Sequence, residues 1–240
     1  GRSTISVTAQ WEPSDRMHVI SDWSEGGVRE GSVSSGRQCR SWWGVGVLVA
    51  QLGCGGGAMS VLEVDEGVSW ALAERRAATL SDVHYRYALQ VPRELATPLS
   101  GTVGIEFRWS DPDAHALVLD FKDPGARVTK LQVNGVSVDW TSRFDHVLLP
   151  AAALVPGARN HVEVAFVAGD EALNRNEEFL YTLFVPDRAH FSLPLFDQPN
   201  LKARFSLTLE VPEGWVALAN GEGLALPGEE GTSVYRFDET

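Results

Sequence analysis

The stretch YTLFVPDRAHFSLPLFDQPNLKARF, residues 181–205, decides the fold, because an aromatic and aliphatic run breaks at Asp-Gln-Pro and then resumes as an alternating strand. Pro199 cannot donate a backbone hydrogen bond, and it pushes Gln198 into extended geometry. The Asp197 carboxylate can accept hydrogen bonds from the backbone N–H groups that follow it. We therefore predict a fixed corner at Phe196, Asp197, Gln198 and Pro199. Flanking hydrophobic side chains would anchor this corner, each contributing about 1.5 to 3 kcal/mol when fully buried.

Hydrophobic and polar residues alternate along most of the chain beyond residue 80, which is the period of half-buried β-strands. Strands are expected at 84–91, 103–109, 117–121, 161–167, 205–211, 215–219 and 233–237, and the one good helical window is 68–78. Asn134-Gly135 predicts a two-residue hairpin turn between two of these strands, because both residues tolerate a positive φ. Short strands separated by turn residues predict an all-β fold, a curved two-sheet β-sandwich.

The charge balance restricts the partners of the protein. The 240 residues include 20 basic and 32 acidic side chains, for a net charge of -12. Nucleic acids and anionic membranes both require a cationic footprint. We therefore predict no nucleic-acid partner. Both cysteines, Cys39 and Cys54, lie in the first quarter of the chain, so no disulfide framework holds the main body.

Residues 1–60 are predicted to be a disordered or signal-like segment, and residues 61–240 a β domain that is truncated at its C-terminal end. Two arginines precede an uncharged apolar run at 41–62, the layout of a secretory signal. Leu-Gly-Cys ending at Cys54 partly matches the end of a bacterial lipoprotein signal. Two readings stay open. Translation from Met59 would give a cytoplasmic protein, whereas a working signal would give a periplasmic one, or one bound to the membrane through a lipidated Cys54.

The residues alone reveal no complete active site. None of the six histidines has a second histidine or a cysteine at metal-binding spacing, and H-E-x-x-H is absent. The sequence also lacks G-x-S-x-G and a phosphate-binding glycine loop. We therefore predict that this chain holds no catalytic residue and no metal ligand, and that it is inactive alone.

The opening stretch closely resembles the N-terminal domain of the zinc metalloaminopeptidases of the aminopeptidase N and leukotriene-hydrolase family. The resemblance rests on Tyr181, Thr182, Pro194, Phe196, Asp197, Gln198, Pro199, Lys202, Ala203 and Phe205. Further segments at 87–89, 99–107, 131–135 and 215–221 fall in the same order as in the family. The resemblance therefore covers about residues 68–240.

The resemblance implies a saddle-like, noncatalytic β domain that shapes the substrate pocket of an aminopeptidase acting on peptides. It implies a downstream catalytic domain, outside this chain, in which two His and a Glu hold zinc. By the same resemblance, Leu183, Phe184 and Val185 form a substrate-binding loop. The family pattern has Gln and Glu where this chain has Leu183 and Val185. Either the catalytic domain alone recognises the substrate amine, or this member prefers other substrates. The alternative reading is a noncatalytic scaffold or interaction protein with the same fold.

Overall fold

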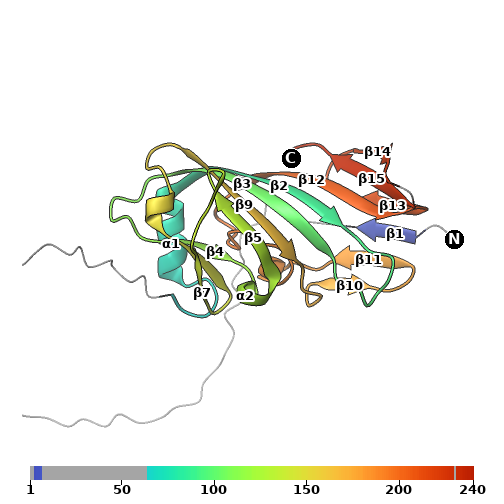
Figure 1. Cartoon of the computed structure of the whole chain (residues 1–240), viewed down its shortest axis with the longest axis horizontal. Coiled ribbons are helices and arrows are strands. Elements are labelled where there is room, and N and C mark those ends of the chain that lie inside the picture. Colours follow the sequence, from blue (N-terminus) through green and yellow to red (C-terminus); the bar gives the residue numbers. More distant parts are fainter. Residues whose placement is uncertain (1–2, 7–63, 230) are drawn as a thin grey trace, which may run out of the picture. The chain divides into compact units, whose positions relative to one another are not determined.

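The largest element of the computed structural model is an eight-stranded sheet (Figure 1). The structure describes residues 3–6, 64–229 and 231–240. In spatial order the strands of the large sheet are β14 (Gly223–Pro227), β15 (Thr232–Phe237), β12 (Ala203–Pro212), β2 (Leu80–Gln90), β3 (Ser100–Trp109), β9 (Arg159–Val167), β5 (Val128–Val133) and β6 (Val136–Ser137). Neighbouring strands are antiparallel except β12 and β2, which run parallel. This architecture confirms the predicted β-sandwich class.

Two smaller sheets complete the fold. One contains β4 (Leu117–Asp120), β8 (His146–Leu149) and β7 (Thr141–Arg143), and the other contains β10 (Leu173–Arg175), β11 (Phe179–Thr182), β1 (Ser3–Ser6) and β13 (Trp215–Leu218). β1 falls within the segment predicted to be disordered or signal-like. Its own sequence carries no strand period, and its hydrogen-bonding partners are the distant strands β11 and β13. The other residues of that segment, Cys54 and Met59 among them, lie outside the described residues.

The hydrophobic core lies on one face of the large sheet. Val103, Ile105 and Phe107 of β3 are fully buried, as their alternation predicts. The ring of Phe107 meets the edge of Phe196 at 6.0 Å between centroids. Apolar side chains of β4 and β8 join the same core. The large sheet is therefore packed directly against the segment that contains the Asp-Gln-Pro corner.

Helix α1 (Trp70–Thr79) confirms the predicted helical window. It begins at Ser69, whose hydroxyl oxygen accepts a hydrogen bond from the backbone N–H of Leu72 at 3.3 Å. Leu72 and Arg76 lie four residues apart and are both buried, so one helix face points inward. The remaining helical turns are α2 (Pro124–Arg127), η1 (Ala151–Ala153) and η2 (Ala189–Phe191). Among the described residues, no helix is long and apolar enough to cross a membrane.

The hairpin between β5 and β6 has the turn that the sequence predicts. Asn134 has a φ of 51° and Gly135 a φ of 81°. Val133 and Val136 face each other across the turn. Two consecutive positive φ values are the signature of the type I′ turn, whose twist matches that of the flanking strands.

Candidate functional site

The predicted substrate-binding loop follows β11 directly. Leu183 and Val185 are 52% and 64% exposed, whereas Phe184 between them is only partly exposed and packs against the core. The Leu183 N–H donates to the Ala172 carbonyl at 2.8 Å, and the Arg188 N–H donates to the Phe184 carbonyl at 2.9 Å. The loop therefore presents two aliphatic side chains to solvent from a backbone held at both ends.

Two polar side chains beside this loop, those of Arg188 and Tyr181, are engaged within the domain. The Arg188 guanidinium donates to the Glu171 carbonyl and lies over the ring of Phe191, 5.8 Å from its centroid. Tyr181 accepts a hydrogen bond from the Asn174 side-chain amide at 2.6 Å. Leu183 and Val185 thus form an apolar exposed patch, and the exposed carboxylate of Asp187 follows it two positions further along the loop.

The Asp-Gln-Pro corner is held by a different set of bonds from the one predicted. The Asp197 carboxylate accepts from the backbone N–H of His190 at 3.1 Å and contacts the His190 ring Nδ1 at 2.7 Å. It therefore binds a residue before the triplet, and the prediction that it accepts from the following N–H groups is wrong. The reason is a local fold of the chain: turn η2 brings His190, seven residues earlier, back over the corner.

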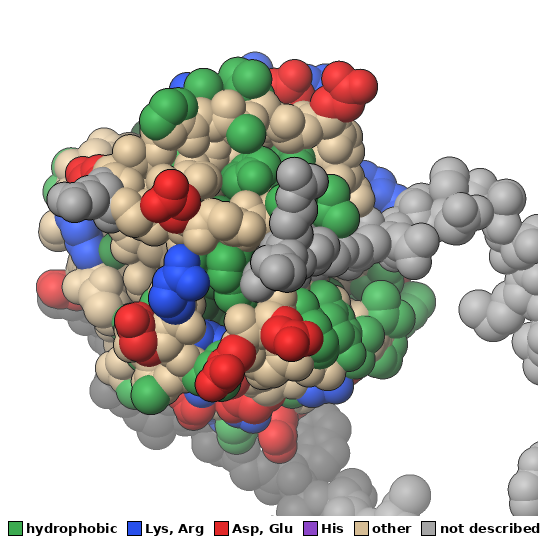
Figure 2. Space-filling model, turned by 90° about the vertical axis from the view of Figure 1, so that its right-hand side faces the viewer, with side chains coloured by type: hydrophobic (Ala, Val, Ile, Leu, Met, Phe, Trp, Pro, Cys, Tyr) green, Lys and Arg blue, Asp and Glu red, His purple; other side chains and the backbone are tan. Residues whose placement is uncertain are grey.

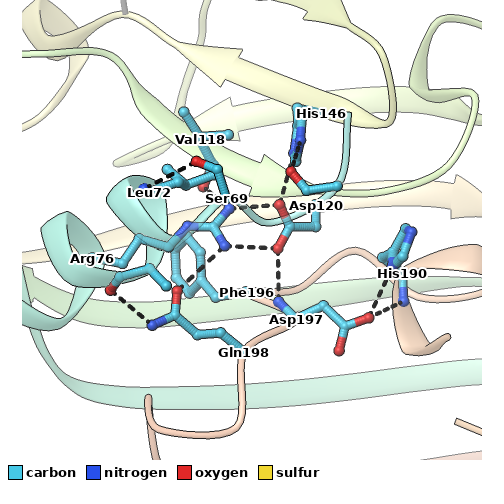
Figure 3. A network of polar contacts seen from close by, with 12 residues as sticks. Ser69, Leu72, Arg76, Val118, Asp120, His146, His190, Phe196, Asp197 and Gln198 are labelled. Carbon is cyan, nitrogen blue, oxygen red and sulfur yellow. Dashed lines mark hydrogen bonds and ion pairs between the residues drawn. The ribbon is translucent and has the colours of Figure 1, made fainter. Parts of the chain in front are cut away.

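A buried ion pair supports the corner from beneath (Figure 3). The Arg76 guanidinium donates two hydrogen bonds to the Asp120 carboxylate, at 2.6 and 2.8 Å, and a third to the Val118 carbonyl at 2.9 Å. The side chains of Arg76 and Asp120 are 3% and 1% exposed. The same carboxylate accepts the backbone N–H of Asp197 at 2.7 Å. Helix α1, strand β4 and the corner thus meet at one carboxylate.

Two further side chains extend this network. His146 of β8 places Nδ1 2.7 Å from the Asp120 carboxylate, and its Nε2 lies 3.1 Å from the Gly67 carbonyl. The Gln198 side-chain amide donates to the Ala73 carbonyl of α1 at 3.1 Å. These contacts tie the segment before α1, and α1 itself, to the corner.

The electrostatic balance at Asp120 favours the ionised form. Burial alone would raise the pKa of this carboxyl group. The charge of Arg76 and the hydrogen bonds from His146, Arg76 and the Asp197 N–H outweigh burial and hold the pKa below its ordinary value. The opposite balance applies to His190. Burial would lower its pKa, but the hydrogen bond and charge of Asp197 raise it. The surroundings thus favour the ionised form of the Asp120 carboxyl group and the protonated form of the His190 ring.

Two tyrosines complete the support of the segment that enters the corner. The Tyr85 hydroxyl oxygen accepts the Phe196 N–H at 3.0 Å, and the Tyr87 hydroxyl donates to the Pro194 carbonyl at 2.7 Å. Both tyrosines lie on β2, at alternate positions of its buried face. The backbone that carries the loop and the corner is therefore fixed to the large sheet. This continuous segment, residues 183–199, is the candidate functional site.

The sequence analysis missed Arg76, Asp120 and His146, because their partners are far apart in the chain. It also missed His190, although its partner Asp197 lies only seven residues later. A usable signal exists for Arg76, which stands four residues after Leu72 on the apolar side of a capped helix. Asp120 interrupts an apolar run between Leu119 and Phe121, and a buried strand with one carboxylate requires a partner.

One group among the described residues has the composition of a cation site. Ligand atoms of Asp111, Asp113 and His115 all lie within 4.8 Å of one another. The Asp111 carboxylate already accepts from the backbone N–H groups of Asp113 and His115, at 3.0 and 3.2 Å, and contacts the His115 ring at 3.1 Å. Hydrogen bonding within one loop therefore accounts for the grouping.

Comparison with known proteins agrees with the resemblance in the sequence. Residues 166–240 match the Peptidase M1 N-terminal domain. The chain is 32% identical over 124 residues to aminopeptidase N of Streptomyces lividans, covering 47% of this chain and 14% of that protein. It is 28% identical over 135 residues to leucyl aminopeptidase of Saccharolobus solfataricus, covering 54% of this chain and 17% of that protein. The chain thus spans less than a fifth of these relatives.

Solved structures show the same fold. An M1 zinc metallopeptidase from Deinococcus radiodurans matches with a TM-score of 0.57 at 24% identity, covering 66% of this chain and 38% of that one. Aminopeptidase A of Legionella pneumophila matches with a TM-score of 0.57 at 16% identity, covering 66% of this chain and 19% of that one. The family match, the two relatives and the shared fold agree with one another. They support an N-terminal domain of the M1 peptidase family, matched directly over residues 166–240.

Proposed function

We propose that this chain is the noncatalytic N-terminal domain of a zinc-dependent aminopeptidase that removes N-terminal residues from peptides. In this proposal, Leu183, Phe184 and Val185 form one wall of the substrate pocket, and a catalytic domain downstream of residue 240 supplies the opposite wall. Support comes from the relatives, which are named as aminopeptidases, and from a Deinococcus M1 zinc metallopeptidase solved with a Tyr-Ser-Ala substrate.

The observation that carries the proposal is the exposure of Leu183 and Val185 on an otherwise well-held segment. In this proposal the two side chains, which lie close together on one loop, form a small apolar patch that another group covers. The network of Arg76, Asp120 and Gln198 fixes the segment that follows the loop, so the loop is positioned before any ligand arrives. Such preorganisation reduces the cost of ordering on binding.

In this proposal the chemical contribution of Leu183 and Val185 is an apolar wall. Leu183 and Val185 offer no hydrogen-bond acceptor to a substrate ammonium group. They contribute by burying apolar substrate surface and by excluding water. Recognition of the amine, and the zinc implied by the names of the relatives, belong in this proposal to the catalytic domain. Asp111, Asp113 and His115 do not fit that role, because the acceptors of Asp111 are engaged within the loop.

The test uses the longer protein that contains this domain and its downstream region. We expect one zinc ion per chain and hydrolysis of a free aminoacyl reporter but not of its N-acetylated form. The alternative, a noncatalytic scaffold, predicts neither zinc nor hydrolysis, and that result would overturn the proposal.

A further inference from the structure

The outward side chains of β11 continue the apolar patch of Leu183 and Val185 toward the start of the strand. Successive side chains of an extended chain point to opposite faces, so residues two apart share a face. Leu180 and Phe184 point inward, because the first is 2% exposed and the second packs against the core. Tyr181 is 37% exposed, as expected for the opposite face. Its ring therefore lies on the same exposed side as Leu183.

The Tyr181 ring is held in place from two sides. Its hydroxyl accepts the Asn174 side-chain amide at 2.6 Å, and its ring stacks on Phe179 with the centroids 5.8 Å apart and the planes at 27°. The hairpin that opens β11 fixes Phe179 in turn, because the Asn176 side chain accepts the Phe179 N–H at 2.9 Å. Figure 2 faces the end of the molecule where Figure 1 labels β11, and hydrophobic side chains gather on this face. A ring that is already ordered loses little conformational freedom when it binds a partner.

The spacing between this aromatic pair and the proposed substrate wall matches the repeat of an extended peptide. Residues two apart on an extended chain lie about 7 Å apart, which applies to Tyr181 and Leu183. A substrate peptide bound in extended form has the same repeat. When the side chain of its first residue lies against Leu183, the side chain of its third residue reaches Tyr181, and that of its second residue points away.

We propose that Tyr181 and Phe179 form a second substrate subsite, which favours peptides with an aromatic third residue. This inference rests on the proposed function, because it requires that Leu183 line the substrate pocket. An aromatic substrate side chain would stack on the exposed face of the Tyr181 ring and bury apolar surface of both partners. Tyr181 thus determines specificity and takes no part in cleavage of the peptide bond.

The test compares Leu-Ala-Phe amide with Leu-Ala-Ser amide as substrates of the longer protein. Both peptides have the same first peptide bond and lack a terminal carboxylate, so the ratio of their kcat/KM values reports the third residue alone. We expect a ratio of about five or more, the size of effect typical of an aromatic pair. Tyr181→Ser should bring the ratio to about one, and Tyr181→Phe should preserve it. The matched control is Phe144→Ser, which removes a 52% exposed ring between β7 and β8 and should leave the ratio unchanged.

A ratio of about one in the unmodified protein, or an unchanged ratio in Tyr181→Ser, would overturn the proposal. If the unchanged ratio comes with a lower Tm of the longer protein, the ring instead packs against the catalytic domain. The aminoacyl reporter has no third residue, so a protein that cleaves the reporter but shows a ratio of about one lacks the subsite and keeps the proposed function. If Tyr181→Ser does not fold, Tyr181→Leu retains an apolar side chain without a ring, and it should still lower the ratio at least twofold.

Discussion

Replacing Arg76 by methionine should destabilise the domain strongly. The substitution removes both hydrogen bonds to Asp120 and the bond to the Val118 carbonyl, while methionine preserves helix propensity and most of the side-chain volume. Because Asp120 is 1% exposed, its carboxylate would stay buried without its cation. Breaking a buried ion pair from one side costs about 3 to 5 kcal/mol. That is a large part of a typical domain stability of about 5 to 15 kcal/mol.

The assay is urea denaturation followed by tryptophan fluorescence. With an m-value of about 1 to 3 kcal/mol/M, the midpoint of Arg76→Met should fall by roughly 1 to 3 M. The matched control is Arg75→Met on the same helix, since Arg75 makes no ion pair among the described residues. The Asp120 amide and the corner should also exchange faster in Arg76→Met.

The stability difference between Arg76→Met and the unmodified protein should depend on pH in a definite direction. The pKa of Asp120 is lowered in the folded protein, so the stability that the ion pair contributes is present above the unfolded pKa and is lost as pH falls through the folded pKa. In Arg76→Met the same carboxyl can protonate more readily, so the difference between the two proteins should shrink in acid. A midpoint shift no larger than that of Arg75→Met would refute the reasoning.

Three further outcomes are expected. Gly135→Val should cost on the order of 1 to 3 kcal/mol, because a β-branched residue would be forced to a φ of 81°, and an unchanged unfolding midpoint would contradict the type I′ turn. The destabilisation by His190→Gln should be largest below pH 6.5, because protonated His190 pairs with Asp197, and it should decline as pH rises through the raised pKa of His190. Thermal melts of both proteins at several pH values measure this, and a Tm difference that does not change with pH would contradict it. The 240-residue chain should retain no stoichiometric zinc after dialysis against a weak chelator, and one ion per chain, lost in Asp111→Asn, would instead establish a site in that loop.

Local patterns predicted most of the large sheet. β2 and β3 alternate cleanly because one face is buried along their whole length, and the Asn134-Gly135 turn depends only on the φ preferences of two residues. Strands β7 and β8 were not predicted. β8 begins with His146, a buried polar residue whose place in the core depends on a carboxylate 26 positions earlier. β1 also escaped prediction, because its pairing partners lie more than 170 residues away.

The candidate site was likewise predicted only in part. The corner at Phe196–Pro199 was predicted from local chemistry, because proline restricts its own backbone and that of its neighbour. The partners of the corner could not be predicted, since Arg76 and Asp120 approach it from elements that are distant in the chain. Sequence reasoning therefore located the bend but not the charges that hold it.

The kinetics of Val185→Glu in the longer protein test the central claim most directly. A carboxylate at this position would lie beside the amine of a bound peptide if the loop lines the pocket. It would then attract the ammonium group or perturb neighbouring carboxylates. The matched control is Val136→Glu, because Val136 is 65% exposed and Val185 64% exposed. We expect kcat/KM for aminoacyl substrates to change at least several-fold in Val185→Glu, with little change in Tm, and to stay unchanged in Val136→Glu. Kinetics of Val185→Glu indistinguishable from those of the parent protein would contradict the assignment of this loop to the substrate pocket.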